Sequence, residues 1–210
     1  MKPRALDCLK VKKLNVNPFA APLCIVCVKY GTKYGADYVN KLYWGIKENI
    51  TIQFTFVCFT DNAEGLDEEI KPVSLTDHQW SGWWSKVNIF NGEKYKDFFV
   101  GKGKSVLVFY IDLDMIISGK IDELIMAYRG NFVTLSTNDI FCEQTQDGYN
   151  SSVMIFAVEN KGGRYISQVQ ILYETLTKYY HHVIKYLMRF DHYLEMLIWN
   201  ADILQELVPG

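Results

Sequence analysis

The sequence of 210 residues predicts an α/β fold, with a central, mostly parallel sheet flanked by helices and a helical C-terminus. Three observations support this expectation. The first elements alternate as strand, helix and strand, which is typical of α/β domains. In the apolar runs, polar residues do not alternate with apolar ones. This pattern is typical of strands in a sheet that is covered on both faces. From about Arg164 onwards, apolar residues recur every three or four positions, the spacing of helices.

The first half of the chain predicts three strands and one helix. The expected strands are rich in β-branched and aromatic residues, and the expected helix places Val39, Leu42 and Ile46 on one face. The first strand ends at Gly31 and the second ends in an acid, Asp61. In order, we expect a strand over 22–31, a helix over 36–49, a strand over 51–61 and a short strand over 71–75.

The second half predicts further strands before the terminal helices. An apolar strand, SVLVFYI, is followed directly by Asp112, Leu113 and Asp114. Gly130 is expected to close a short helix. In order, we expect the start of a helix over 80–91, a strand over 105–111, a short helix over 119–130, strands over 131–137 and 149–158, and helices from about residue 164.

Composition and charge narrow the classes of partner. The formal net charge is −2 and no cationic block lies beyond the N-terminal stretch, so an obligate nucleic-acid partner is not expected. No apolar run is long enough to cross a bilayer, so we expect no transmembrane segment. The five cysteines are odd in number and three lie in expected strands, which favours reduced core cysteines. This predicts a cytoplasmic protein.

The N-terminal residues 1–22 are expected to lie outside the main domain. They are basic and contain Leu6, Leu9 and Leu14, without the continuous apolar stretch of a signal peptide. We expect either a leader of little order or a strap against the domain. Residues 23–210 are long enough for a single domain with a substantial core, which could stand alone or belong to a longer protein.

Asp112 and Asp114 are candidates for metal chemistry. On an extended chain, residues i and i+2 point to the same side, roughly 7 Å apart, while Leu113 between them turns toward the core. Two carboxylates repel each other unless a cation lies beside them. Mg²⁺ and Mn²⁺ prefer oxygen ligands and share them with phosphates, so the pair predicts a metal–diphosphate site. The alternative is a solvated strand end or a cap for the next helix.

Six segments in order carry a resemblance to a known family. They are the strand and D-x-D with IISGKIDELI (105–125), CIVCVKYGTKYGADYVNKLYWGIK (24–47), FVCFTD (56–61), GWWSKVNIF (82–90), GYNSSVMIF (148–156) and FDHYLEML (190–197). Together they resemble GT-A type glycosyltransferases over residues 23–197. The likeness is closest to family 8 and its small relatives in bacterial and large-virus (chlorella-virus-like) surface-glycan pathways. For a viral source it would imply the host cytoplasm as the location.

The resemblance implies a role for individual residues. The implied donor-binding residues are Tyr30, Gly31, Tyr34, Asp61, Lys86, Asp112 and Leu113. Among them, Asp61 would accept the uracil N–H and Lys86 would neutralise diphosphate oxygens. The implied metal ligands are Asp112 and Asp114, and the implied sugar contacts are Asn150, Ser151, Ser152 and Asp191. Each has a simpler alternative: surface aromatics at Tyr30 and Tyr34, a solvated Lys86, strand polar residues at Ser151 and Ser152, and a helix cap at Asp191.

The family implies metal-dependent transfer of a sugar from a UDP-sugar to a hydroxyl of a glycan or glycoprotein acceptor. Mn²⁺ or Mg²⁺ would be the cofactor. Asp191 is the candidate catalytic base if the reaction inverts, and it would hold the donor sugar if the reaction retains configuration. Family 8 usually has a later H-x-x-G-x-x-K-P-like segment with a third metal ligand, which residues 198–210 lack. Water and phosphate would then complete the coordination, or a later segment would.

Two other functions remain as alternatives. One is a catalytically silent nucleotide-sugar-binding module. The other is a haloacid-dehalogenase-type phosphatase, which also ends an apolar strand in D-x-D. That motif usually lies near the N-terminus and has Thr or Val where this chain has Ile116, so the phosphatase is the less favoured of the two.

Overall fold

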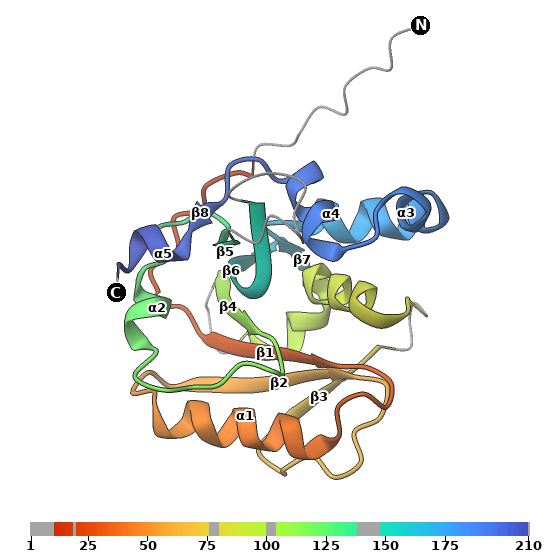
Figure 1. The fold of residues 1–210 in the computed structure, drawn as a ribbon. Helices are drawn as coiled ribbons and strands as arrows, with labels where there is room; N and C mark the ends of the chain where they lie inside the picture. Colours follow the sequence, from red (N-terminus) through yellow and green to blue (C-terminus); the bar gives the residue numbers. More distant parts are fainter. Residues whose placement is uncertain (1–10, 19, 76–79, 100–103, 138–147, 210) are drawn as a thin grey trace, which may run out of the picture.

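The computed structural model describes residues 11–18, 20–75, 80–99, 104–137 and 148–209. Within them, an eight-stranded sheet has helices on both faces, which confirms the predicted α/β class (Figure 1). The strands are β1 (Leu23–Lys29), β2 (Phe54–Thr60), β3 (Lys71–Ser74), β4 (Ser105–Ile111), β5 (Val133–Thr137), β6 (Gly148–Lys161), β7 (Arg164–Ser167) and β8 (Asp202–Ile203). The helices are α1 (Ala36–Glu48), α2 (Asp122–Met126), α3 (Gln170–Tyr186), α4 (Phe190–Leu197) and α5 (Leu204–Leu207), with 3₁₀ helices η1 (Gly82–Phe90) and η2 (Gly92–Phe98).

The sheet is parallel on one side and mostly antiparallel on the other, where β8 pairs in parallel with β5. β1 pairs in parallel with β2 and β4, and β2 pairs in parallel with β3. The long β6 runs antiparallel to β4, β5 and β7. The strand order is β3-β2-β1-β4-β6-β5-β8, with β7 beside β6. The carboxyl ends of β1, β2 and β4 therefore meet at one edge, where ligands of such sheets bind.

Both faces of the sheet are covered, as the apolar strands predict. In β4, Val106, Val108 and Tyr110 belong to a core shared with η1, α3 and α4. The alternate residues Leu107 and Phe109 belong to a second core shared with α1 and α2. Because successive strand residues point to opposite faces, β4 is buried along almost its whole length.

The chain near Arg164 differs from the predicted helix. Arg164–Ser167 form β7, and α3 begins six residues after Arg164, at Gln170. Gly162 and Gly163 join β6 to β7 with φ values of 63° and 90°. Two successive residues with positive φ make a hairpin turn whose twist suits paired strands. The helical prediction is wrong at this point, because the Gly-Gly pair specifies a hairpin.

The predicted helix start at residues 80–91 is a 3₁₀ helix, η1. Two side chains bond to carbonyls three residues earlier. Ser85 Oγ donates to the Gly82 carbonyl at 2.7 Å, and Asn88 Nδ2 donates to the Ser85 carbonyl at 3.0 Å. Such side-chain bonds compete with the hydrogen bonds of an α-helix. They account for the tighter winding, while Trp84 and neighbouring residues are still buried.

A strap at the start of the described chain (residues 11–16) packs against the body. Val11 and Leu14 are buried. The Leu14 N–H donates to the Gly130 carbonyl at 2.7 Å. Asn200 exchanges two hydrogen bonds with the Val11 backbone, at 3.0 and 3.2 Å. These contacts fasten the strap to the turn after α2 and to the segment after α4.

The described cysteines are buried and carry free thiols: Cys24, Cys27 and Cys58. Burial raises the pKa of the Cys24 thiol to about 12, so this thiol stays protonated. Cys8, Cys142 and residues 1–10 of the expected leader lie outside the described residues. In the part of the chain that the structure describes, no helix is both long and apolar enough to span a membrane.

The strap contact can be tested at Gly130, whose φ is +90° and where a Cβ would clash with the Leu14 carbonyl oxygen. Gly163 also has a φ of +90°, but nothing lies within 4 Å of its Cβ position. In urea unfolding, Gly163→Ala should lower the free energy of unfolding by about 1–2 kcal/mol, the cost of a left-handed alanine. Gly130→Ala should cost about 2 kcal/mol more, because the strap must move. Equal losses would contradict the strap contact.

Candidate functional site

The predicted site residues gather where three neighbouring strands end. Tyr30 and Gly31 follow β1, Asp61 follows β2, and Asp112 follows β4. β1 is hydrogen-bonded to β2 on one side and to β4 on the other, so these three ends are adjacent. Lys86 on η1, the first residues of β6 and the first turn of α4 reach the same edge through the contacts described below.

Asp112 is held by two neighbouring side chains. The Lys86 ammonium lies 2.9 and 3.1 Å from its two carboxylate oxygens. The Tyr110 hydroxyl donates to Asp112 Oδ1. The side chains of Lys86 and Asp112 are 11% and 22% exposed, so solvent screens this ion pair weakly. The negative charge of Asp112 is therefore largely balanced within the protein.

Tyr110 is a site residue that sequence reasoning missed. Its side chain is buried in the core. Burial, and next the charge of Asp112, raise the pKa of the phenol well above its ordinary value. The hydroxyl therefore stays protonated and remains a donor to Asp112. Residues 110 and 112 are two positions apart at the end of a strand, which places both side chains on one face, so the spacing was a usable signal.

Lys86 also connects Asp112 to the predicted sugar residues. Its ammonium donates to Ser151 Oγ at 3.1 Å. The Ser151 N–H in turn donates to Asp191 Oδ1 at 2.8 Å. The ammonium lies 5.5 Å from the centre of the Phe190 ring, within cation–π range. Lys86 is thus part of a buried network and is not a solvated surface lysine.

The α4 carboxylates bind a part of β6 that extends beyond the end of β4. Backbone N–H groups in this overhang have no β4 strand to bond to and need other acceptors. Asp191 Oδ1 accepts from Ser151 N–H at 2.8 Å, and Glu195 Oε1 accepts from Tyr149 N–H at 2.9 Å. The N-cap of α4 is Arg189. The alternative role of Asp191 as a helix cap is therefore wrong, because its carboxylate binds the strand.

Asp114, the second aspartate, is exposed and accepts a hydrogen bond from the Tyr34 hydroxyl at 2.9 Å. The Lys33 ammonium lies 4.6 Å from the centre of the Tyr34 ring. The pKa of Lys33 is raised, mainly by its hydrogen bond with Tyr34 and further by Asp114. Lys33 was not among the predicted residues. At the adjacent strand end, the Gly31 N–H donates to Asp61 Oδ2 at 2.9 Å.

The remaining predicted residues differ in their access to this edge. Tyr30 is half-buried and packs against the core on the η1 side. Leu113 is buried in the opposite core, so its backbone, and not its side chain, is available to a ligand. Asn150 and Ser152 are half-buried, and Asn150 Oδ1 accepts from the Ser152 N–H at 2.9 Å.

The donor atoms at this edge fit a divalent cation that brings phosphate oxygens with it. Among the residues that the structure describes, no group of three His, Cys, Asp or Glu side chains could hold a metal ion. Both oxygens of Asp112 contact Lys86, whereas Asp114 is exposed. Mg²⁺ is commonly bound by one or two carboxylates together with substrate phosphates and water. The extended backbone expected for this pair is wrong, because the chain turns after Asp112 and the Met115 N–H donates to the Asp112 carbonyl at 3.3 Å. The exposed Asp114, two residues after Asp112, still suits that mode of binding.

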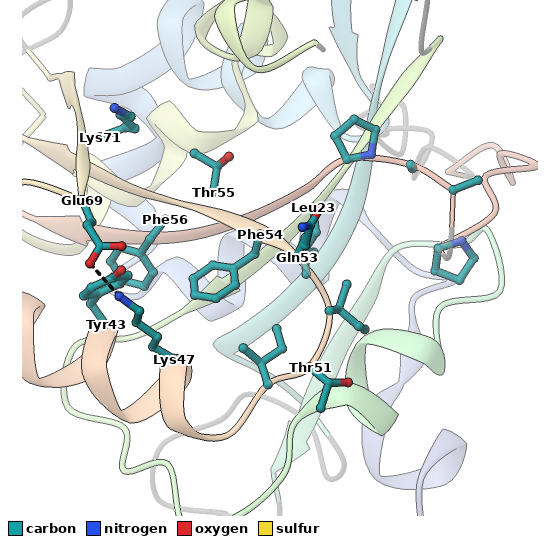
Figure 2. Close-up of a pocket in the computed structure, with 16 residues that line it drawn as sticks. Leu23, Tyr43, Lys47, Thr51, Gln53, Phe54, Thr55, Phe56, Glu69 and Lys71 are labelled. Carbon is teal, nitrogen blue, oxygen red and sulfur yellow. Dashed lines mark hydrogen bonds and ion pairs between the residues drawn. The ribbon is translucent and has the colours of Figure 1, made fainter. Parts of the chain in front are cut away.

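A groove of about 1280 Å³ lies at the opposite ends of the strands and contains none of the predicted site residues. It borders the starts of β1 and β2, at Leu23 and Phe54. Figure 2 shows Lys47 pointing toward Glu69 across part of this groove, where the two form an ion pair of 2.6 Å beside Tyr43. The two charges neutralise each other. The predicted site residues lie at the carboxyl edge of the sheet, away from this groove.

Comparisons with known proteins find similar folds among solved structures of glycosyltransferases. No protein-family profile and no curated protein matches the sequence. Among solved structures, the galactosyltransferase LgtC, in complex with donor and acceptor sugar analogs, has a TM-score of 0.54 at 12% identity, over 83% of this chain and 70% of LgtC. The glycosyltransferase GlyE of Streptococcus pneumoniae TIGR4 has a TM-score of 0.53 at 13% identity, over 84% of this chain and 43% of GlyE.

A third similar structure is the WbbM bifunctional glycosyltransferase, with a TM-score of 0.50 at 9% identity, over 92% of this chain and 40% of WbbM. The predicted GT-A fold is confirmed by these likenesses. The chain spans less than half the length of GlyE and of WbbM. At such identities the likeness establishes the fold, and the activity has to be argued from the site.

The energetic coupling of Lys86 with Asp112 can be measured by a double-mutant cycle in urea unfolding. The double variant Lys86→Met with Asp112→Asn should lose less free energy of unfolding than the sum of the two single variants, with a coupling above about 1 kcal/mol. The reason is that each single substitution leaves the partner side chain poorly solvated and without its counterpart. The matched control is the exposed Lys41–Asp37 pair, 3.0 Å apart and 76% and 58% exposed. Its coupling should stay below about 0.5 kcal/mol. Equal couplings would contradict the special position of Lys86.

Proposed function

We propose that this chain is a metal-dependent glycosyltransferase that moves a sugar from a UDP-sugar to an acceptor hydroxyl in glycan synthesis. The observation that carries the proposal is the double contact of the Lys86 ammonium with Asp112 and Ser151. Through these two contacts, Lys86 connects the end of β4, which would face the donor diphosphate, with β6, which would contact the donor sugar. The fold likeness to glycosyltransferases supports the same class of reaction.

The nucleoside would lie over the ends of β1 and β2. Tyr30 and Tyr34 offer aromatic rings near the turn after β1, and Gly31 allows a ligand to approach the backbone closely. Asp61 binds the Gly31 N–H with one carboxylate oxygen. Its side chain is exposed, so the second oxygen can accept the N–H of uracil. This pair of contacts would orient the base.

The diphosphate would lie over the end of β4. Asp114, with Asp112 beside it, would hold Mn²⁺ or Mg²⁺, which supplies Lewis-acid stabilisation to the leaving UDP. Lys86 adds a fixed positive charge at this point, and its bonds to Asp112 and Ser151 keep the ammonium in place. Tyr110 orients Asp112 through its hydroxyl.

The donor sugar would lie between the overhang of β6 and the first turn of α4. Ser151, whose hydroxyl accepts from Lys86, and the neighbouring Asn150 and Ser152 would contact it from β6. Asp191 binds Ser151 N–H with one oxygen and offers the other to a sugar hydroxyl or to the acceptor. In an inverting reaction Asp191 would take the proton of the acceptor hydroxyl, and in a retaining reaction it would hold the donor sugar. Ordering donor and acceptor at one edge supplies part of the rate enhancement.

A catalytically silent nucleotide-sugar-binding module is the second candidate. One observation favours it: among the described residues, no group of three His, Cys, Asp or Glu side chains lies close enough to hold a metal ion. Such a module would bind UDP without turnover. The haloacid-dehalogenase alternative loses support, since its D-x-D usually lies near the N-terminus and this one follows β4, in the middle of the chain.

UDP with Mn²⁺ should raise the melting temperature. At 100 times the Kd, the native state gains about 2.7 kcal/mol, which corresponds to roughly 5–10 °C for a chain of this size. Asp114→Ala should remove most of the gain, because it removes the exposed ligand of the metal. Differential scanning fluorimetry measures the shift, with Asp97→Ala, another exposed carboxylate, as the control. Equal stabilisation of wild type and Asp114→Ala would reject the metal assignment.

Turnover tests the role of Asp191. A panel of nucleotide sugars is screened for metal-dependent hydrolysis, and the best donor is used for transfer. Asp191→Asn should lower the turnover rate by about 100-fold or more with little change in UDP affinity. The control is Glu195→Gln, which alters the equivalent bond from α4 to β6 one turn later. Equal losses in both variants would mean that Asp191 acts through the fold, and UDP binding without any turnover in wild type would favour the silent module.

A further inference from the structure

The second half of α3 and the link to α4 expose large apolar side chains. Tyr186 and Met188 are 71% and 81% exposed, and Tyr179 and Ile184 are also exposed. We name residues 178–189 the basic aromatic segment. Large apolar groups that gather on a surface, rather than occurring singly, mark sites of interaction. This segment therefore needs an explanation beyond the fold.

The exposed side chains do not come from a poorly packed helix. Leu172, Leu176 and Val183 of α3 are buried against the core. The Tyr180 ring packs beside Trp80, with ring centroids 6.2 Å apart. The helical backbone is interrupted at Tyr179, with φ −127° and ψ 22°, yet Leu176 before the break and Val183 after it are both buried. The exposed side chains therefore belong to a helix that packs on the core on both sides of the break.

The segment is positively charged, although the whole chain has a net charge of −2. Between residues 175 and 190 the sequence has no aspartate or glutamate and three cationic residues: Lys178, Lys185 and Arg189. The ammonium groups of Lys178 and Lys185 lie 5.0 and 5.4 Å from the ring centres of Tyr179 and Tyr186. The same Lys-Tyr pair thus occurs twice, seven residues apart, each time with a cation beside an exposed aromatic ring.

The segment borders the candidate site. α4 follows it directly, and Asp191 in the first turn of α4 binds Ser151 of the site. On the other side lies η1, which carries the lysine of the site and exposes Trp83 to 57%. The Ser81 N–H at the start of η1 donates to the Tyr180 hydroxyl at 3.5 Å. Figure 1 shows α3 and α4 next to each other on the η1 side of the molecule.

We propose that the basic aromatic segment, together with Trp83, docks on a membrane surface that contains anionic phospholipids. Tyrosine and tryptophan favour the zone between headgroups and hydrocarbon, where Tyr179, Tyr186 and Trp83 would lie. Ile184 and Met188 would enter the acyl boundary. The cations of the segment would meet lipid phosphates, which attract basic residues near an anionic surface.

The observations favour a membrane over an acidic protein as the partner. An acidic protein would account for the cations, but the membrane also accounts for the exposed aliphatic and thioether groups interleaved with them. A hollow of about 450 Å³, lined by Trp80 and residues 177–182, lies within the segment and could receive a lipid headgroup beside Lys178. Docking would bring the candidate site to the bilayer surface, within reach of acceptors held there. Membrane docking of this segment does not require glycosyl transfer.

Co-sedimentation of the full chain with vesicles tests the proposal. One set of vesicles is phosphatidylcholine alone, and the other is an equal mixture with phosphatidylglycerol. At low salt, we expect wild type to bind the mixed vesicles at least about ten-fold more strongly than the neutral ones. Lys178→Glu with Lys185→Glu should lower this affinity by about ten-fold or more. Tyr186→Ser with Met188→Ser should also lower it, although the charge is unchanged.

The matched control is Lys41→Glu with Trp44→Ser on α1, because both residues are exposed and α1 covers the opposite face of the sheet. This variant should bind the mixed vesicles as wild type does. Wild type that leaves both vesicle types unbound, as expected for an acidic protein partner, would overturn the proposal. Equal binding by all variants would overturn it as well. The melting-temperature shift with UDP and Mn²⁺ should persist in the segment variants, so failure of docking and failure of the proposed function are distinguishable.

Discussion

The site depends on one interaction: a largely buried ammonium, Lys86, held between the carboxylate of Asp112 and the hydroxyl of Ser151. A charge taken out of water is costly unless a counter-charge and hydrogen bonds accompany it. Asp112 supplies the counter-charge, and Ser151 supplies one of the hydrogen bonds. Because these residues lie on β4 and β6 and Lys86 lies on η1, the three elements must meet at this point. The contacts that would serve a ligand are thus the same contacts that bring three elements together.

The topology of the sheet explains why the predicted site residues gather at this edge. Parallel strands β1, β2 and β4 end together; Tyr30 and Gly31 follow β1, and an aspartate follows each of β2 and β4. β6 runs in the opposite direction and continues past the end of β4. Its first residues therefore lie over the open edge, with backbone groups that need partners from outside the sheet. The helix α4 provides them, and in doing so it forms the far wall of the candidate site.

Much of this arrangement could be predicted from local patterns. Apolar runs ended by Asp61 and Asp112 indicated buried strands with polar carboxyl ends, and both cores bear this out. The misses have particular causes. The strand β7 lay at the start of an apparent helical period, and the Gly162-Gly163 turn just before it specifies a hairpin over these few positions. The strap contact of Gly130 joins positions far apart in the chain, and no local pattern reports such a contact.

The two carboxylates of α4 have a geometric consequence for the chain around them. Asp191 and Glu195 are four residues apart, about 6 Å along a helix, and the N–H groups that they bind are two residues apart, about 6.6 Å along a strand. The spacing of the two carboxylates along the helix therefore matches the spacing of the two N–H groups along the strand. If α4 were shifted by one residue, its carboxylates would turn about 100° away from the strand. The strand, and not the preceding link, thus sets the register of α4. Insertions or deletions in that link can reshape the outer surface while Asp191 keeps its place.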